Sequence, residues 1–304
     1  MEATLRPCGD ADGRRVAVTT SKPDPGAALV TGASSGIGYA VVDELLRAGT
    51  IVYAGVRTDA DAARLAEIED SVRPLILDVT VPEQIAAAAQ RIARDGVPLR
   101  AVVCNAGIAL GGPLEFLPLE RLRYQLEVNL VGALAVAQAA LPMLRQTHGR
   151  LLFVGSISGR LTPPFVGPYA ASKAALAALT DALRIELDAS GSGISVSLFE
   201  FGSVKTPIWE KGGSSLERLE AQASPEQRRY YGFVPGAMRA NLAHESKHGV
   251  DVRVVARAIA RAALGPRPRE RYVLGGGAKA GALVAAFLPV RARGTLMRRV
   301  MRLP

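Results

Sequence analysis

The chain has 304 residues, enough for one large α/β domain with a complete hydrophobic core. Hydrophobic residues make up 49% and charged residues 21%, which is typical of a globular protein. Cys8 and Cys104 lie far apart, and the three histidines form no ligand pattern. We therefore expect no disulfide framework, no metal site and a reducing, cytoplasmic compartment.

The net charge of +9 is concentrated near the C-terminus. Residues 267–302 contain nine Lys or Arg and one acid, Glu270, so this stretch alone carries +8. Apolar residues lie between the basic ones, a pattern that favours peripheral membrane contact over nucleic-acid binding. A basic end that is merely solvated is the alternative. Residues 280–290, the most apolar stretch, have about half the length of a membrane span.

Residues 1–25 are polar and interrupted by Gly and Pro, and we expect a disordered leader there. Beyond it, β-rich runs alternate with helical ones. We expect strands at residues 27–31, 51–56, 75–78, 99–104, 150–155, 194–200 and 271–274. Helices are expected at residues 36–48, 61–70, 82–94, 119–145, 168–190 and 251–264.

This alternation predicts an α/β fold, a doubly wound, Rossmann-like parallel sheet in a single domain over residues 26–275. Residues 207–249 interrupt this alternation of strands and helices with a polar segment that contains Gly and Pro. Residues 276–304 form a basic, amphipathic C-terminal extension. We treat both segments as appendages of the one domain.

A glycine-rich segment, TGASSGIG at residues 31–38, follows the first strand and opens the first helix. Glycines let the backbone approach a pyrophosphate closely, and a helix N-terminus attracts that anion. The spacing is GxxxGxG instead of the GxGxxG of most dinucleotide folds. The segment predicts a dinucleotide-binding loop with contacts from Gly32, Ser34, Ser35, Gly36, Ile37 and Gly38.

Arg57 and Asp78 follow the second strand and close the third. An acid in the position of Arg57 would bind the ribose 2′-hydroxyl of NAD, whereas an arginine accommodates the 2′-phosphate of NADP. We therefore expect NADP, with NAD as the alternative. Asp78 is placed either to accept a hydrogen bond from the adenine amino group or to cap the next helix.

Tyr169 and Lys173 stand four residues apart at the start of a predicted helix, which puts them on one face. A phenol beside an ammonium ionises more easily than its usual pKa of roughly 10 allows, and so becomes a usable acid or base. Ser156 lies thirteen residues before Tyr169 and is placed to bind the substrate oxygen. Ser158 is its rival for that role.

Together with Asn105-Ala106-Gly107 and Asn129, these motifs resemble those of the short-chain dehydrogenase/reductase family over residues 26–206. Shorter stretches are most similar to the 17β-hydroxysteroid and retinol dehydrogenases. The resemblance implies that Tyr169 exchanges a proton with the substrate oxygen while a hydride moves to or from the nicotinamide. Lys173 would hold the ribose hydroxyls and lower the pKa of Tyr169, and Asn129 would support a water chain to Lys173.

The resemblance also implies cofactor contacts from Asn105, Ala106, Gly107, Tyr169, Lys173, Val204 and Thr206. Phe201-Gly202-Ser203 replaces the Pro-Gly of most family members, and we expect bulky Phe201 to reshape the nicotinamide side of the pocket. Family members commonly pair through the helices that bear Asn129 and Tyr169, so a homo-oligomer, dimer or tetramer, is implied as well.

We therefore expect an NAD(P)-dependent oxidoreductase that interconverts an alcohol and a carbonyl on a hydrophobic, steroid-, retinoid- or lipid-like substrate. Residues 207–249 would form its helical substrate lid, because they supply many apolar side chains. One alternative is a 3-oxoacyl-thioester reductase. Another is a sensor or scaffold that binds NADP without turnover.

Overall fold

The computed structural model describes residues 26–205, 220, 221 and 223–304. Its central sheet has seven parallel strands in the order β3-β2-β1-β4-β5-β6-β9. The strands are β1 (Ala27–Thr31), β2 (Ile51–Val56), β3 (Val72–Ile76), β4 (Leu99–Cys104), β5 (Arg150–Val154), β6 (Ser195–Phe201) and β9 (Arg271–Leu274). The predicted Rossmann-like parallel sheet in a single domain is confirmed.

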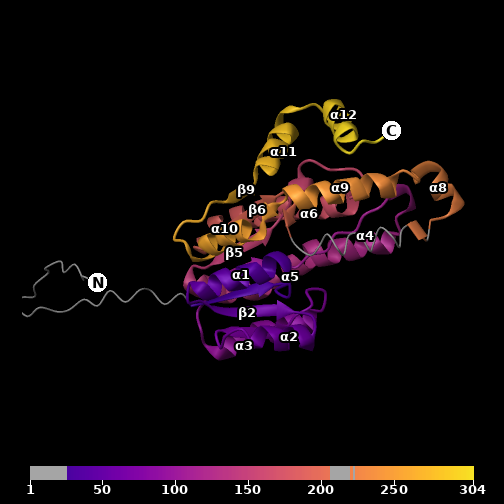
Figure 1. Cartoon of the computed structure of the whole chain (residues 1–304). Coiled ribbons are helices and arrows are strands. Elements are labelled where there is room, and N and C mark those ends of the chain that lie inside the picture. The colour runs from indigo at the N-terminus through magenta and orange to yellow at the C-terminus, as the bar shows by residue number, and fades with distance from the viewer. Residues whose placement is uncertain (1–25, 206–219, 222) are drawn as a thin grey trace, which may run out of the picture.

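Helices cover both faces of this sheet (Figure 1). One face carries α1 (Gly36–Arg47), α2 (Asp59–Ala66) and α10 (Val252–Leu264); the other carries α3 (Pro82–Asp95), α5 (Gly132–Thr147) and α6 (Gly167–Ala189). Successive strand residues point to opposite faces, so Leu29 joins one hydrophobic cluster and Val30 the other. Both clusters need apolar residues, which is why the strands read as continuous hydrophobic runs.

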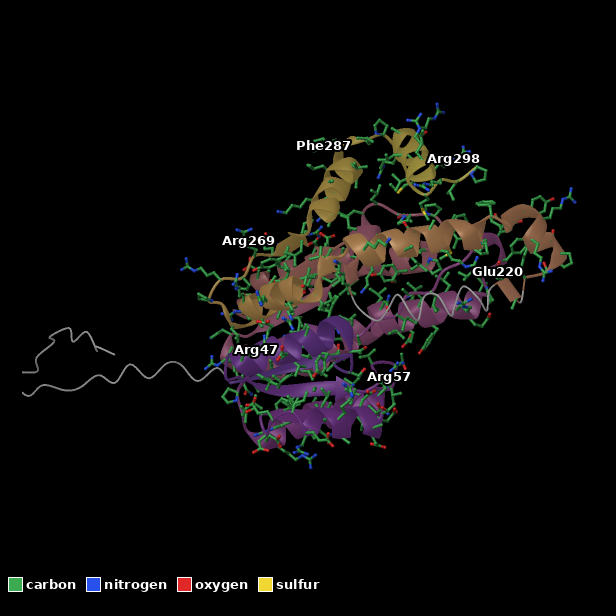
Figure 2. All side chains as sticks on the ribbon, viewed as in Figure 1. Arg47, Arg57, Glu220, Arg269, Phe287 and Arg298 are labelled. Atoms are coloured by element: carbon green, nitrogen blue, oxygen red, sulfur yellow. The ribbon has the colours of Figure 1, made fainter. Side chains whose placement is uncertain are left out.

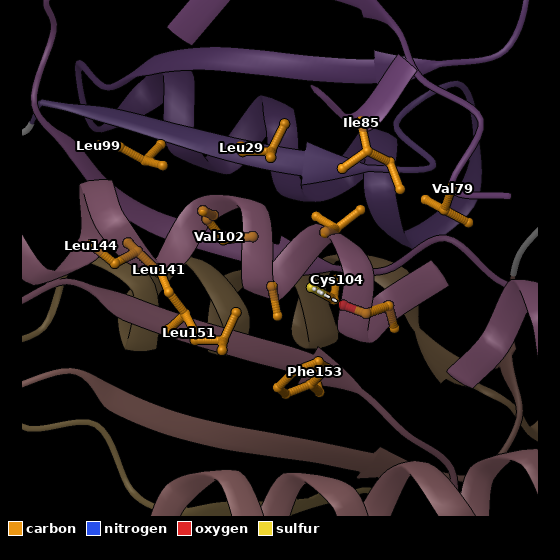
Figure 3. Close-up of a cluster of buried hydrophobic side chains, with 14 of the residues drawn as sticks. Leu29, Val79, Ile85, Leu99, Val102, Cys104, Leu141, Leu144, Leu151 and Phe153 are labelled. Atoms are coloured by element: carbon orange, nitrogen blue, oxygen red, sulfur yellow. Dashed lines mark hydrogen bonds between the residues drawn. The ribbon is translucent and has the colours of Figure 1, made fainter. Parts of the chain in front are cut away.

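The cluster on the α3–α5 face contains Cys104 (Figure 3). Its Sγ donates a weak hydrogen bond to the carbonyl oxygen of Ala133, 3.6 Å away. Burial raises the pKa of this thiol to about 12. Cys104 is therefore a packing residue without thiolate chemistry.

The predicted long helix at residues 119–145 is present but interrupted. α4 (Leu119–Leu126) passes through a π-helical turn, η2 (Glu127–Val131), into α5. In the described part of the chain this is the one helix long and apolar enough to cross a membrane by length and composition. Its buried side chains pack against β4 and α3, so it serves as a core helix.

The third strand begins three residues and ends two residues before the predicted 75–78. Pro74 argues against a strand by composition, but β3 is an edge strand, where proline costs no ladder hydrogen bond. Helix α2 likewise begins two residues early, because the Thr58 hydroxyl caps it by accepting from the Asp61 backbone N–H at 3.1 Å.

Two appendages extend from the sheet. The first includes α8 (Pro225–Tyr231) and α9 (Val234–His248) and is held by β7 (Val204–Lys205) pairing with β8 (Val250–Asp251). The second consists of α11 (Gly276–Phe287) and α12 (Val290–Val300), which project away from the domain (Figure 1). The predicted leader at residues 1–25, Thr206 and most of the first part of the predicted lid lie outside the described residues.

Candidate active site

The glycine-rich loop follows β1, where the order in which the chain adds strands to the sheet reverses. From β1 the chain builds toward β2 and β3 on one side, and β4 begins the other side. Gly32 and Gly36 have positive φ angles of 64° and 59°, which favour glycine. A Cβ at Gly32 would lie 2.9 Å from Ala106 Cα, and one at Gly38 would lie 2.2 Å from the Gly32 oxygen. Side chains are therefore excluded at both positions.

Thr31 and Asn105 hold this loop against the segment after β4. The Thr31 hydroxyl accepts from the backbone N–H groups of Asn105 and Ala106, both at 3.0 Å. Asn105 Nδ2 donates to the carbonyl oxygens of Thr31 and Gly32 at 2.9 and 3.2 Å. Asn105 thus holds the backbone of the glycine-rich loop in place. Sequence reasoning missed Thr31, although it is a polar residue ending a strand of buried apolar ones.

The cradle is completed by Ser34 and Ser35 before α1 and by Gly36 and Ile37 in its first turn. Ser35 is the N-cap residue, yet its side chain makes no capping hydrogen bond in the described structure. The leading N–H groups of a helix need acceptors, and an anion supplies them well. The arrangement therefore fits a bound pyrophosphate.

Two arginines flank this cradle beyond β2. Arg57 is exposed at the end of the strand (Figure 2), and Arg64 of α2 donates to the Ser34 carbonyl oxygen at 2.7 Å. Arg64 also pairs with Asp61 at 2.9 Å. The hydrogen bond from Arg64 is the largest of several effects that lower the pKa of Asp61, and the charge of Arg57 contributes. Sequence reasoning found no second cation in the glycine loop itself; α2 brings one beside it.

Asp78 lies two residues beyond β3. Its Oδ1 accepts from the backbone N–H and the hydroxyl of Thr80 at 2.9 and 2.7 Å, and its own N–H donates to Gln84 Oε1 at 2.6 Å. Asp78 therefore stabilises the turn before α3, but its side chain does not cap that helix, whose N-cap residue is Val81. An adenine contact stays a prediction.

Ser156 and Tyr169 meet just beyond β5. Ser156 is only 6% exposed, and its hydroxyl accepts from the Ser158 backbone N–H at 3.1 Å. Burial raises the pKa of Tyr169, and a hydrogen bond with the Ser156 side chain opposes that rise. Of the two candidate serines, Ser156 is the one whose side chain the structure couples to Tyr169.

Lys173 lies one turn after Tyr169 on α6, with its Nζ 5.8 Å from the centre of the Tyr169 ring. Nζ donates to the Val154 carbonyl oxygen at 2.7 Å, and burial lowers the pKa of Lys173 to about 8. The pKa of Tyr169 is thus raised overall, and a lowering by the ammonium stays a prediction. Burial dominates for both groups, and the ammonium is held by a carbonyl oxygen instead of the phenol.

Asn129 lies in the π-helical turn and is 1% exposed. Its side chain accepts from the Ile108 N–H at 2.8 Å and donates to the Ile108 carbonyl at 2.9 Å and to Ser172 Oγ at 3.0 Å. A Cβ at Gly107 would lie 3.3 Å from Asn129 Oδ1 and 3.7 Å from Lys173 Nζ. The structure thus brings Asn129, Gly107 and Lys173 together, and a water relay stays a prediction.

Comparison with known proteins shows which family the chain belongs to. The model of the short chain dehydrogenases matches residues 26–216. The chain belongs to the short-chain dehydrogenase/reductase family. This makes it an oxidoreductase of the type that acts on alcohol and carbonyl groups.

Two curated relatives and one solved structure cover most of this dehydrogenase. An NADPH-dependent 3-dehydrocapnine reductase of Ornithobacterium rhinotracheale is 33% identical over 81% of this chain and 87% of its own. Human retinol dehydrogenase 16 is 34% identical over 86% of this chain and 84% of its own. A Burkholderia cenocepacia short chain dehydrogenase, solved with NADP, has a TM-score of 0.67 and 27% identity, covering 92% of this chain and 98% of its own.

Four aromatic residues in this dehydrogenase join the predicted lid to the loops near Ser156 and Tyr169. Phe165 has a φ of 65°, unusual for a bulky residue, and its carbonyl oxygen accepts from the Gly112 N–H at 2.7 Å. The Phe165 ring contacts Tyr231 and Phe233 edge-on, at centroid distances of 6.5 and 6.0 Å, and Phe116 contacts Tyr231 at 5.7 Å. Because these residues come from distant segments, the sequence pattern did not reveal the cluster.

Phe201 does not have the predicted effect on the pocket. It is 5% exposed and belongs to the hydrophobic cluster beneath α1 and α10. Its neighbour Glu200 is also buried and accepts from Arg160 Nε at 2.9 Å, with Arg271 Nη1 at 3.6 Å. This contact ties the segment after Ser156 to β6. Val204 is buried in β7, where it pairs with Val250.

Proposed function

We propose that this short-chain dehydrogenase is an NADP-dependent enzyme that interconverts an alcohol and a carbonyl on a hydrophobic substrate. The observation that carries the proposal is the set of buried Ser156, half-buried Tyr169 and buried Lys173 at the same end of the sheet as the glycine cradle. Hydride transfer to a carbonyl requires proton-transfer groups next to a bound dinucleotide, and both sites lie at this one end of the sheet.

The cofactor would lie across the C-terminal ends of β1 and β4, with its pyrophosphate at the first turn of α1. The nicotinamide supplies or accepts the hydride when bound. Arg57, and Arg64 beside Ser34, would face the 2′-phosphate, which favours NADP over NAD. The name of the Ornithobacterium reductase and the ligand of the Burkholderia structure support the same choice.

Tyr169 would act as the proton donor in carbonyl reduction. Because burial raises its pKa above the ordinary 10.0, the phenol carries its proton at neutral pH. The O–H bond of Tyr169 would break as its proton passes to the substrate oxygen. The Ser156 hydroxyl would donate to that same oxygen and stabilise its developing negative charge. Lys173 would then supply positive charge next to the phenolate.

A hydrophobic substrate is supported by the aromatic cluster of Phe116, Phe165, Tyr231 and Phe233 between the lid and the loop that precedes Tyr169. Tyr231 also donates to Glu115 at 2.8 Å, which fixes the lid on this side. The retinol dehydrogenases among the relatives act on a substrate of the proposed class.

We further propose a homo-oligomer, a dimer or tetramer, through α4–α5 and α6. Supporting this, apolar residues on these helices are exposed: Leu119, Val131 and Ile185 by 59, 48 and 62%. For localisation we propose the cytoplasm, with peripheral contact to a membrane through the C-terminal extension.

The test is the loss of reduced-nicotinamide absorbance with steroid, retinoid, long-chain and 3-oxoacyl-thioester carbonyls. The wild type should turn over at least one hydrophobic carbonyl, Tyr169→Phe should lose at least about a hundredfold in kcat, and the matched surface variant Tyr124→Phe should not. Turnover of thioesters alone would favour the 3-oxoacyl-thioester reductase. Tight NADP binding without turnover would favour a sensor or scaffold, and an active Tyr169→Phe would refute the mechanism.

A further inference from the structure

Helices α11 and α12 project away from the domain and expose apolar side chains (Figure 1). Ala278 is the one buried residue of α11, and α12 has none. Leu283, Phe287 and Val290 are 60, 79 and 74% exposed. Leu283 and Phe287 share one helix face, and Val290 follows directly after the turn between the helices. Figure 2 shows Phe287 at the outer end of α11.

The same segment is strongly basic. Residues 276–304 contain six cations and no Asp or Glu, so their net charge is +6. The cations are Lys279, Arg291, Arg293, Arg298, Arg299 and Arg302. Within the described residues none of them is paired with an Asp or Glu carboxylate, although Arg298 donates to the oxygen of Pro304. Arg293 Nε is buried without a hydrogen-bond partner. Arg298, Arg299 and Arg302 line one hollow at the end of α12.

We propose that the α11–α12 tip, residues 283–302, is a docking surface for an anionic lipid bilayer. Leu283, Phe287 and Val290 enter the interface between headgroups and acyl chains, and the arginines contact lipid phosphates. A second copy of the chain is a poor occupant, because it would bring another +6 surface against the first. A nucleic acid is also a poor occupant, because its polar, hydrated interface would not bury the exposed apolar side chains of the tip.

The inner side of α11 links this surface to the active site. A Cβ at Gly281 would lie 3.1 Å from Ile157 Cγ1 and 3.7 Å from Leu161 Cδ2, so the helix backbone packs directly on this loop. Ile157 begins the short helix η3 (Ile157–Gly159), whose N-cap is Ser156. Docking would therefore hold the Ser156 loop beside a bilayer in which a hydrophobic substrate partitions. Lipid binding deepens the membrane contact named under the proposed function, and the link to the Ser156 loop rests on the proposed catalysis.

Co-sedimentation of the full chain with vesicles tests the proposal without any substrate. We expect binding to phosphatidylcholine vesicles that contain phosphatidylglycerol, little binding to phosphatidylcholine alone, and weakening by salt. Arg298→Glu/Arg299→Glu and Phe287→Ser/Val290→Ser should each lower the partition coefficient at least about tenfold. The control Arg253→Glu/Val254→Ser, on exposed residues of α10, should leave it unchanged.

A fluorescence measurement tests insertion separately. Phe287→Trp emission should shift to shorter wavelength with anionic vesicles, whereas emission of Val254→Trp should not. Thermal melting of each variant establishes that it is folded. The proposal is overturned if the wild type does not bind anionic vesicles, or if the arginine and apolar variants bind them like the wild type. It is also overturned if the apolar variant changes only the oligomeric state. A protein–protein surface would explain the last result.

Discussion

Lys173 Nζ donates a hydrogen bond to the carbonyl oxygen of Val154 at 2.7 Å, at the end of β5. The buried ammonium is thus tied to the strand that presents Ser156, and α6 is tied to the sheet by the same contact. Lys173 therefore holds the geometry of the site in addition to any contact with the cofactor.

The first prediction concerns stability and pH. Burial lowers the pKa of Lys173 from 10.5 to about 8, so between these values the unfolded chain binds more protons than the folded one. The free energy of unfolding should therefore rise with pH across this window, by about 3 kcal/mol for the full shift. Lys173→Met should lack this rise. Urea unfolding of both proteins at several pH values measures it, and parallel pH profiles would contradict the assignment.

The second prediction concerns the cradle. Gly38→Ala places a Cβ 2.2 Å from the Gly32 oxygen and 2.6 Å from Asn105 Nδ2, so the loop must move. We expect the dissociation constant for NADPH, measured by calorimetry, to rise at least about tenfold. Gly236→Ala is the control, because a Cβ there meets nothing within 4 Å. Equal affinities in the two variants would show that the cradle does not hold the cofactor.

The third prediction concerns cofactor choice. Arg57→Ala and Arg64→Ala should each weaken NADPH binding about tenfold, since each removes a cation from the proposed 2′-phosphate position. NADH binding should hardly change. The exposed Arg123→Ala on α4 serves as the control. A parallel loss for both cofactors would place these arginines elsewhere than at the 2′-phosphate.

The fourth prediction concerns the buried Glu200 carboxylate. Glu200→Gln keeps the shape but leaves Arg160 and Arg271 without their buried counter-charge. We expect the free energy of unfolding to fall by about 3 kcal/mol. Glu120→Gln, whose side chain is 79% exposed in a surface pair, should cost less than about 1 kcal/mol. Similar losses from both changes would mean that burial adds nothing to the Glu200 interaction.

The sequence pattern predicts the sheet because both of its faces are covered, so each strand is an apolar run between helices. It also predicts Ser156, Tyr169 and Lys173, whose spacing places them near one another. The pKa of Tyr169 could not be predicted from spacing, because it depends on how far α6 buries the phenol. Arg64 was missed for a similar reason: its contact with Ser34 spans thirty residues and depends on how α2 lies over the loop.

The central claim is direct hydride transfer beside Tyr169, and deuterium tracing tests it most directly. The enzyme would be given reduced NADP labelled with deuterium at the transferred position of the nicotinamide, together with a hydrophobic ketone. Mass spectrometry should find deuterium on the carbinol carbon of the alcohol with the wild type and no labelled alcohol with Tyr169→Phe. No label with the wild type, or equal labelling by both proteins, would contradict the account.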